Sequence, residues 1–123
     1  MMFVLMAGFF GCARGPEKPM APGTLVHPVY VSLIDPADAL ELIADCDDRL
    51  GDLPMVRSYA CGVPMDIGRA EVTADYDVAL VVTFEGLDAY RAYLADEDHL
   101  WVVKKWRPRT NWMRIHDVVV PDR

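Results

Sequence analysis

The sequence predicts a single α+β domain, built on a four-stranded antiparallel sheet with helices packed on one face. The chain has 123 residues, enough for one domain. Hydrophobic residues make up 53% and charged residues 25%, as in packed globular proteins. Strand-like and helix-like spacings of apolar residues follow the order strand, helix, strand, strand, helix, strand. That order is typical of the ferredoxin-like fold.

The first strand and helix are predicted from residues 25–51. Residues 25–33, LVHPVYVSL, favour a strand because β-branched and aromatic side chains dominate it. Pro28 lacks an N–H donor, so it predicts an edge strand or a bulge. A helix begins at Asp35-Pro36, where Asp35 caps the first turn and Pro36 suits the first position. Gly51 ends this helix, whose expected apolar stripe is Leu40, Ile43, Cys46 and Leu50.

The middle of the chain predicts two strands joined by a loop. Residues 55–62 alternate in character and predict the second strand, whereas residues 63–75 mix Pro, Gly and charges as loops do. Residues 76–84 predict the third strand. Because its apolar run at 78–82 is unbroken, we expect both of its faces to be covered.

The last third predicts a helix, a second helical segment and a final strand. The expected core stripe of the helix is Leu87, Tyr90 and Leu94. Residues 98–106 continue as another short helical segment, which Pro108 stops. Residues 112–120, WMRIHDVVV, predict the last strand.

Helices on one side leave the other face of the sheet uncovered. Val78, Leu80 and Val82 point to one face, while Ala79 and Val81 point to the other. A second copy packed sheet against sheet would bury this apolar face and leave a cavity between the two sheets. The patterning therefore predicts a homodimer.

Charge is unevenly distributed along the chain. The net charge of −7 argues against a nucleic-acid partner, because phosphate binding needs clustered Lys and Arg. Seven acids lie within residues 35–52 and five bases within residues 104–114. The favoured interpretation is two solvated faces on different elements. The alternative is a basic lip that attracts an anionic ligand or partner.

The N-terminus is expected to lie outside the domain. Residues 1–11 form an uncharged apolar segment like the core of a secretory signal, and Cys12 follows as in bacterial lipoproteins. No Lys or Arg precedes the segment, and Phe9 stands where the lipoprotein pattern has Leu. Residues 12–24 predict a Pro- and Gly-rich linker before a domain at 25–123. Lipidation of Cys12 predicts an exported protein tethered to a membrane. The alternative is an ordinary terminus with a free thiol, in a cytoplasmic protein.

The remaining motifs favour a protein without a cofactor. In an exported protein Cys46 and Cys61 can pair, although two free thiols packed as small apolar residues are favoured. The chain has no CxxC motif and its three His are scattered, which argues against a metal site. No glycine-rich phosphate loop is present, so we expect no nucleotide, metal or haem.

Four short stretches resemble the stress-responsive A/B barrel (Dabb) family of the dimeric α/β-barrel superfamily. Val26-His27-x-Val29 resembles its opening strand, residues 76–85 its central strand, residues 92–99 its helix signature, and Asp117 the acid near its end. The resemblance extends over residues 24–119. One departure is Asp96-Glu97, which stands where the family has His-Pro.

The resemblance implies a homodimer that binds a small apolar ligand in the barrel cavity. It also implies an alternative, a cofactor-free cyclase, lyase or monooxygenase-like enzyme that uses Tyr93 and His99 on a carbonyl substrate. In that reaction a His abstracts a proton and a Tyr hydroxyl stabilises the enolate. The expected ligand-binding residues are His27, Tyr59 and Trp101. Four of these residues also have a structural interpretation. Tyr93 can lie at the edge of the apolar stripe of its helix and His99 can cap the next turn. His27 can be a packed strand residue, and Trp101 can be a core or interface residue. Asp117 is equally suited to an ion pair with Arg114 or a contact with a strand neighbour.

Overall fold

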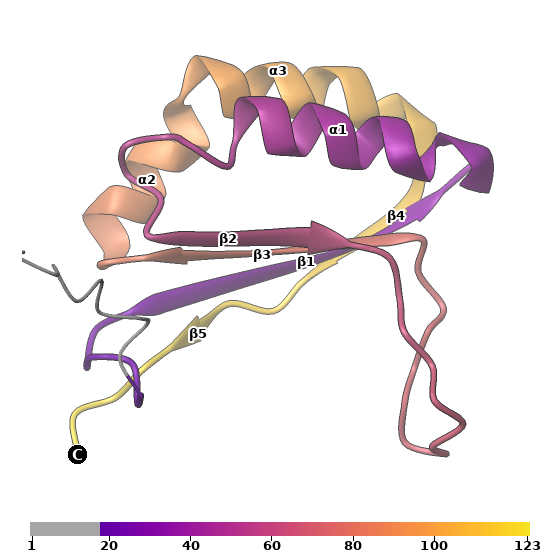
Figure 1. Cartoon of the computed structure of the whole chain (residues 1–123). Helices are drawn as coiled ribbons and strands as arrows, with labels where there is room; N and C mark the ends of the chain where they lie inside the picture. The colour runs from indigo at the N-terminus through magenta and orange to yellow at the C-terminus, as the bar shows by residue number, and fades with distance from the viewer. Residues whose placement is uncertain (1–17) are drawn as a thin grey trace, which may run out of the picture.

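A computed structural model describes residues 18–123, and these form an antiparallel sheet of five strands with three α-helices on one face (Figure 1). The ferredoxin-like prediction is therefore confirmed. The expectations for residues 1–11 and Cys12 lie outside the described residues. The elements are β1 Leu25–Leu33, α1 Ala39–Arg49, β2 Ser58–Gly62, β3 Val78–Phe84, α2 Leu87–Ala95, α3 Glu97–Trp106, β4 Thr110–Ile115 and β5 Val118–Val119, with 3-10 turns at Pro36–Asp38 and Arg107–Arg109.

The sheet order is β2-β3-β1-β4, and β5 also pairs with β1. β1 is thus a central strand, and the prediction that Pro28 marks an edge is wrong. The sheet tolerates Pro28 because pairing along that side of β1 is interrupted between Ile115 and Val118. Opposite the interruption, the His116 N–H donates to the Pro28 carbonyl at 3.3 Å. A residue without an N–H costs little at such a break.

Alternate residues of β3 lie in different environments, as the period of two requires. Val78, Leu80 and Val82 are buried beneath the helices. On the opposite face Val81 is 38% exposed. Half-buried residues of β1 share that open face, among them Tyr30. The sequence thus identified correctly which residues lie under the helices.

The apolar stripe of α1 differs from the prediction by one position. Leu42 and Cys46 are buried, Leu50 just beyond the helix is also buried, and Leu40 is 75% exposed. Asp35 does cap the turn, because its carboxylate accepts from the Ala37 N–H at 3.0 Å. A residue turns about 100° around a helix axis, so Leu40 and Leu42 face nearly opposite directions. The one that faces the sheet is Leu42.

The second helix is also phased differently. Tyr93 is its buried residue at 1% exposure, whereas Leu87 is 51% exposed and Leu94 is 38% exposed. α2 ends at Ala95, and the Asp96 carboxylate caps α3 by accepting from the Asp98 N–H. Because this break limits α2 to nine residues, only a short face of it meets the sheet.

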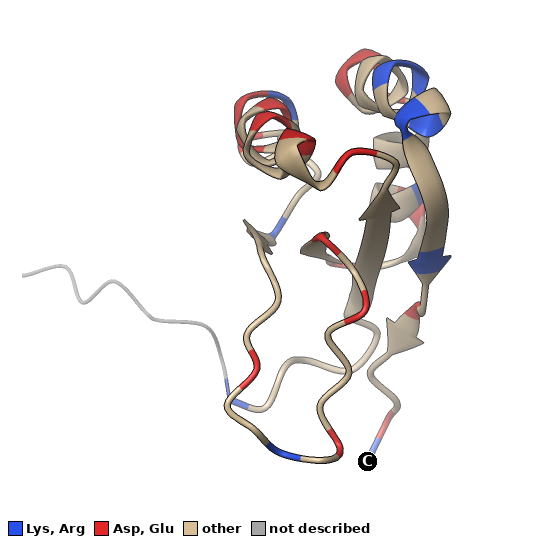
Figure 2. Cartoon of the chain, turned by 90° about the vertical axis from the view of Figure 1, so that its right-hand side faces the viewer, with Lys and Arg blue, Asp and Glu red and all other residues tan. Residues whose placement is uncertain are grey.

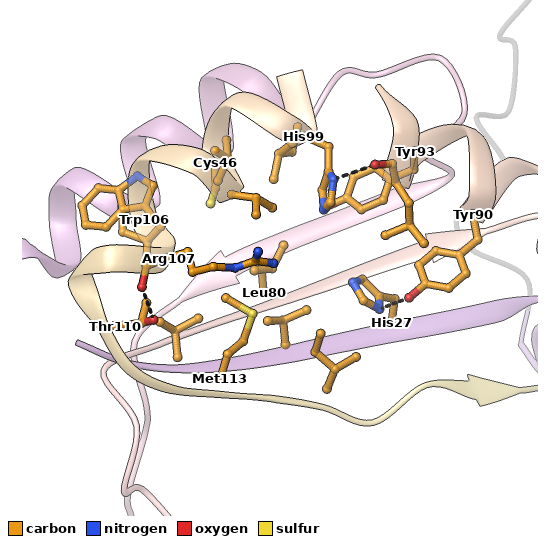
Figure 3. A pocket seen from close by; sticks show the side chains of 18 residues that line it. His27, Cys46, Leu80, Tyr90, Tyr93, His99, Trp106, Arg107, Thr110 and Met113 are labelled. Carbon is orange, nitrogen blue, oxygen red and sulfur yellow. Dashed lines mark hydrogen bonds between the residues drawn. The ribbon is translucent and has the colours of Figure 1, made fainter. Parts of the chain in front are cut away.

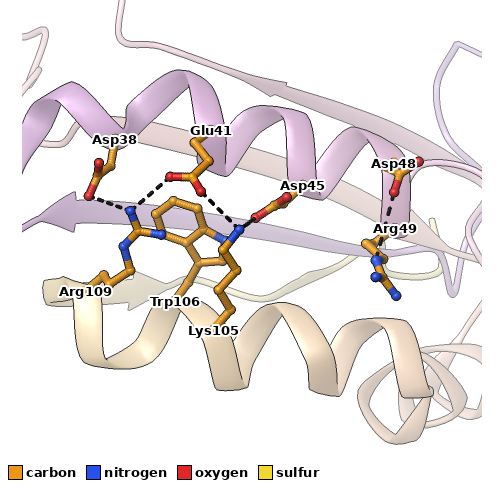
Figure 4. A network of polar contacts seen from close by, with 8 residues as sticks. All are labelled: Asp38, Glu41, Asp45, Asp48, Arg49, Lys105, Trp106 and Arg109. Carbon is orange, nitrogen blue, oxygen red and sulfur yellow. Dashed lines mark hydrogen bonds and ion pairs between the residues drawn. The ribbon is translucent and has the colours of Figure 1, made fainter.

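Acids of the first helix pair with bases of the later basic segment (Figure 4), so the favoured interpretation of two solvated faces on different elements is wrong. Figure 2 shows the acidic and basic residues coloured on neighbouring helices. Lys105 bridges Glu41 and Asp45 at 3.1 and 2.7 Å. Arg109 lies 2.9 Å from both Asp38 and Glu41. α1 and α3 lie side by side, which places their opposite charges in contact.

The described end of the predicted linker is joined to the domain. The Gly23 N–H donates to the Val120 carbonyl at 2.8 Å, and the Val120 N–H donates to the Thr24 carbonyl at 2.9 Å. Thr24 is 2% exposed. These contacts hold the two ends of residues 18–123 together beside β5. Within this range no helix combines the length and apolar character needed to cross a membrane.

Candidate functional site

A cavity of about 230 Å³ lies between the helices and the sheet within one chain (Figure 3). Its walls are mainly apolar, including Val29, Val31 and Leu80 from the sheet. Met113 and Ile115 of β4 line it too and remain 43% and 48% exposed, so the helices leave this edge of the sheet partly uncovered. The cavity is therefore on the helix side, whereas the sequence argument expected one between two packed sheets.

His27 enters the cavity from β1 as part of a polar cluster with Asp117 and Tyr90. The register from Val26–Val118 to Val29–Ile115 places His27 opposite Asp117. His27 Nδ1 lies 2.6 Å from one Asp117 carboxylate oxygen, and the Tyr90 hydroxyl donates to the other at 3.0 Å. Because a carboxylate oxygen accepts, Nδ1 is the donor of this contact, and in the neutral imidazole Nε2 is then the acceptor. Asp117 thus contacts a strand neighbour, while Arg114 pairs with Asp75.

The Tyr90 hydroxyl remains protonated at neutral pH. Burial, followed by the Asp117 carboxylate, raises the pKa of Tyr90 to about 12. Its oxygen lies 3.2 Å from His27 Nδ1, and the two rings are 4.9 Å apart between centroids. Tyr90 was predicted only as a core residue. No sequence signal identified its role, because its partners lie 63 and 27 residues away along the chain.

His99 enters the same cavity from α3 and packs against Tyr93, with 4.5 Å between ring centroids and the rings tilted by 49°. His99 Nδ1 donates to the Leu94 carbonyl at 3.2 Å, which leaves its Nε2 as an acceptor. Burial lowers the pKa of His99 below 6.5, so the imidazole is neutral at neutral pH. Burial also raises the pKa of Tyr93, whose hydroxyl therefore stays protonated.

The structure brings together three of the five site residues that the sequence suggested. His27, Tyr93 and His99 line the cavity, whereas Tyr59 and Trp101 do not. Tyr59 instead donates to Asp47 at 2.9 Å. Trp101 lies against the Arg49 guanidinium, 4.0 Å from its ring centroid. Both are therefore on the α1 side of the domain, held by charged residues of that helix.

Cys46 lines the cavity with a free thiol, and Cys61 is also free. The neighbouring Cys61 thiol and burial raise the pKa of Cys46, so it is an uncharged part of the wall. Residues 18–123 contain no group of three or more His, Cys, Asp or Glu that could hold a metal ion. What the site offers chemically is two imidazoles, each with an accepting Nε2, in an apolar space.

The fold and cavity define a small ferredoxin-like protein with a helix–sheet pocket. The sequence profile described as "Stress responsive A/B Barrel Domain" matches residues 25–120. The chain therefore belongs to the stress-responsive A/B barrel (Dabb) family, as its four motifs indicated. No curated protein matched the chain at a significant level.

Solved structures with this fold include uncharacterised proteins and enzymes. A dimeric ferredoxin-like protein of unknown function from Thermobifida fusca has a TM-score of 0.69 and 20% identity, covering 87% of this chain and all of the other. Hydroxynitrile lyase from Passiflora edulis has a TM-score of 0.70 and 13% identity, covering 84% and 98%. SnoaB, a cofactor-independent oxygenase from Streptomyces nogalater, has a TM-score of 0.60 and 14% identity, covering 84% and 97%. Identities this low establish a shared fold only.

Proposed function

We propose that this protein binds a small, mainly apolar molecule in the helix–sheet cavity. The observation that carries the proposal is the cavity itself, about 230 Å³ and lined mostly by apolar side chains. Ligand pockets combine apolar walls with a few polar groups that set orientation. Here His27 and His99 supply such groups from opposite layers. The volume is below the lower limit of about 300 Å³ for typical ligand pockets, which favours a small compound.

We also propose that the protein is a homodimer formed through the open face of the sheet. Val81 and Val118 are exposed there, at 38% and 53%. Half-buried Tyr30 and Trp112 share this face. A stable interface buries about 800 Å² on each partner, and burying apolar surface yields about 25 cal/mol per Å². The Thermobifida fusca protein of the same fold is described as dimeric.

Native mass spectrometry of the gently purified protein tests both statements. We expect a dimer that retains extra small-molecule mass. Val103→Phe narrows the cavity, because Val103 lines it, and should lose the retained mass while remaining a dimer. Val63→Phe is the matched control, since Val63 is 59% exposed on the loop after β2. A monomer would contradict the dimer, and equal retention by both variants would contradict the cavity.

A second candidate is a cofactor-free enzyme that acts on a carbonyl compound, and the His27–Asp117 contact of 2.6 Å favours it. The carboxylate fixes the imidazole tautomer, so Nε2 can take a proton from a carbon next to a carbonyl. The electron pair then moves onto the carbonyl oxygen, where the protonated Tyr93 hydroxyl can donate. His99, neutral in the same cavity, is the other base available. This assignment adds His27 to the pair predicted from the sequence.

Hydrogen–deuterium exchange of a carbonyl compound separates the enzyme from a binding protein. Cyclohexanone in D2O, followed by proton NMR, reports removal of the proton next to the carbonyl. We expect the protein to accelerate exchange and His27→Gln to reduce that acceleration by about 10²-fold, the usual contribution of a general base. His116→Gln is the control, because His116 lies outside the cavity. Exchange no faster than in buffer, or unaffected by His27→Gln, would contradict the enzymatic candidate.

A further inference from the structure

We propose that the ligand carries an anionic group, a carboxylate in the simplest case, and that Arg107 binds it. This inference rests on the proposed binding cavity and specifies the class of ligand. Arg107 lines the cavity, and Figure 3 shows its guanidinium extending into the space among the labelled wall residues. The predicted ligand is therefore an apolar body with one negative end.

Arg107 gives the cavity an asymmetric charge. Of the residues in 18–123 that line it, Arg107 is the only Arg or Lys, and no Asp or Glu is among them. A cation on an otherwise apolar wall attracts negative charge strongly, because few nearby groups compete with it. This holds although the chain as a whole carries a net charge of −7.

Three basic residues near Arg107 in the sequence are paired with carboxylates, and Arg107 is not. Lys105, Arg109 and Arg114 each lie within 3.1 Å of a carboxylate oxygen. Within residues 18–123 no carboxylate lies within 4.0 Å of the Arg107 guanidinium. Glu41 and Asp45 of α1 are already bound by Lys105 and Arg109, and the five N–H donors of Arg107 are available to a ligand.

The backbone at Arg107 is held in place by its neighbours. Trp106 is 2% exposed, and its indole N–H donates to Asp45 at 2.9 Å. The Thr110 hydroxyl donates to the Arg107 carbonyl at 2.9 Å. Pro108 fixes the next φ angle. The guanidinium is therefore positioned from a fixed Cα, which reduces the entropy lost when it binds a ligand.

Desolvation decides between a neutral and an anionic ligand. A neutral apolar compound that filled the cavity would remove water from the guanidinium and return no hydrogen bonds. A carboxylate replaces that water with two parallel charge-assisted hydrogen bonds in the geometry that Arg favours. Charge-assisted hydrogen bonds contribute enough to give about a tenfold difference in affinity.

Isothermal titration calorimetry with two matched probes tests the inference. 4-Phenylbutyrate and its neutral amide, 4-phenylbutyramide, share one apolar body and differ in charge. We expect the full-length protein to bind the carboxylate about tenfold more tightly at low salt. Arg107→Gln should abolish that preference and change the affinity for the amide by less than about twofold. Lys104→Gln removes the same charge from an exposed position on α3 and should preserve it.

The outcomes separate this inference from the binding proposal. Equal affinity of the wild-type protein for both probes, or a preference that survives Arg107→Gln, would overturn the role of Arg107 and leave the cavity in place. Failure of both probes to bind would count against the cavity as well as the anion. Since Arg107 is exposed, raising the salt concentration should also reduce the carboxylate preference.

Discussion

His27 and His99 line one cavity but are held in different ways. His27 is anchored through a carboxylate, with Asp117 at 2.6 Å, and a tyrosine hydroxyl adjoins both groups. His99 has a single polar contact among the described residues, to the Leu94 carbonyl, and otherwise packs on Tyr93. In both, the Nδ1 hydrogen is donated and Nε2 is left as an acceptor.

The difference shows how one cavity can give two imidazoles separate roles. A nearby carboxylate stabilises the imidazolium that forms when a base takes up a proton. Burial without a carboxylate has the opposite effect, and it lowers the pKa of His99. Asp117 therefore orients the His27 imidazole for proton transfer, and His99 is better suited to orient a bound ligand while remaining neutral.

Among the tests of this difference between His27 and His99, removing the Asp117 carboxylate should change the free energy of unfolding the most. Asp117→Ala leaves the buried His27 N–H and the Tyr90 hydroxyl without their common acceptor. We expect a loss of about 1–2 kcal/mol in the free energy of unfolding, at the lower end for such a group because Asp117 is 39% exposed and water can partly replace it. Urea unfolding monitored by circular dichroism measures the loss.

Two further variants make this prediction specific. Asp117→Asn keeps an acceptor for the His27 N–H and should recover about half of the lost stability. Asp122→Ala removes the same charge from an exposed position near the C-terminus and should change stability by less than about 0.5 kcal/mol. If Asp117→Ala were as stable as Asp122→Ala, the contact would not anchor His27.

The sequence predicted the histidines of this site better than their partners. His27, Tyr93 and His99 came from short motifs, and all three line the cavity. The contact between His27 and Asp117 depends on strand register over 90 residues, which composition and periodicity do not determine. The same is true of Arg107, since the proposal for it depends on Lys105 and Arg109 being paired with Glu41 and Asp45.

The fold was more predictable than the helix phases. The unbroken apolar run of β3 identified the buried strand, and its alternate residues correctly separated the two faces. The error at Leu40 arose because the chain enters α1 through a 3-10 turn at Pro36–Asp38, so no single 3.6-residue period extends over the whole segment. In α2 the side chain that faces the core is Tyr93 and not its neighbour Leu94, at 1% and 38% exposure.

Of these tests, lowering the pH should give the smallest change in the free energy of unfolding, and the comparison with His99→Gln assigns that change to one residue. Burial holds the pKa of His99 in the folded protein below 6.5, the ordinary value of an exposed imidazole in the unfolded chain. Below that value the unfolded chain binds the proton first, so His99 makes folding less favourable as the pH falls through 6.5 toward the folded pKa. Between about pH 7.5 and about pH 5.5, the wild-type protein should therefore lose more stability than His99→Gln.

Urea unfolding at the two pH values measures this difference, and NMR titration of the imidazole signal that disappears in His99→Gln gives its midpoint directly. Equal losses in both proteins, or a midpoint above 6.5, would mean that the cavity leaves His99 solvated. A midpoint below 6.5 would establish that the imidazole of His99 is neutral at neutral pH. His99 would then differ from His27 as the geometry indicates, since only His27 has a carboxylate within hydrogen-bond distance.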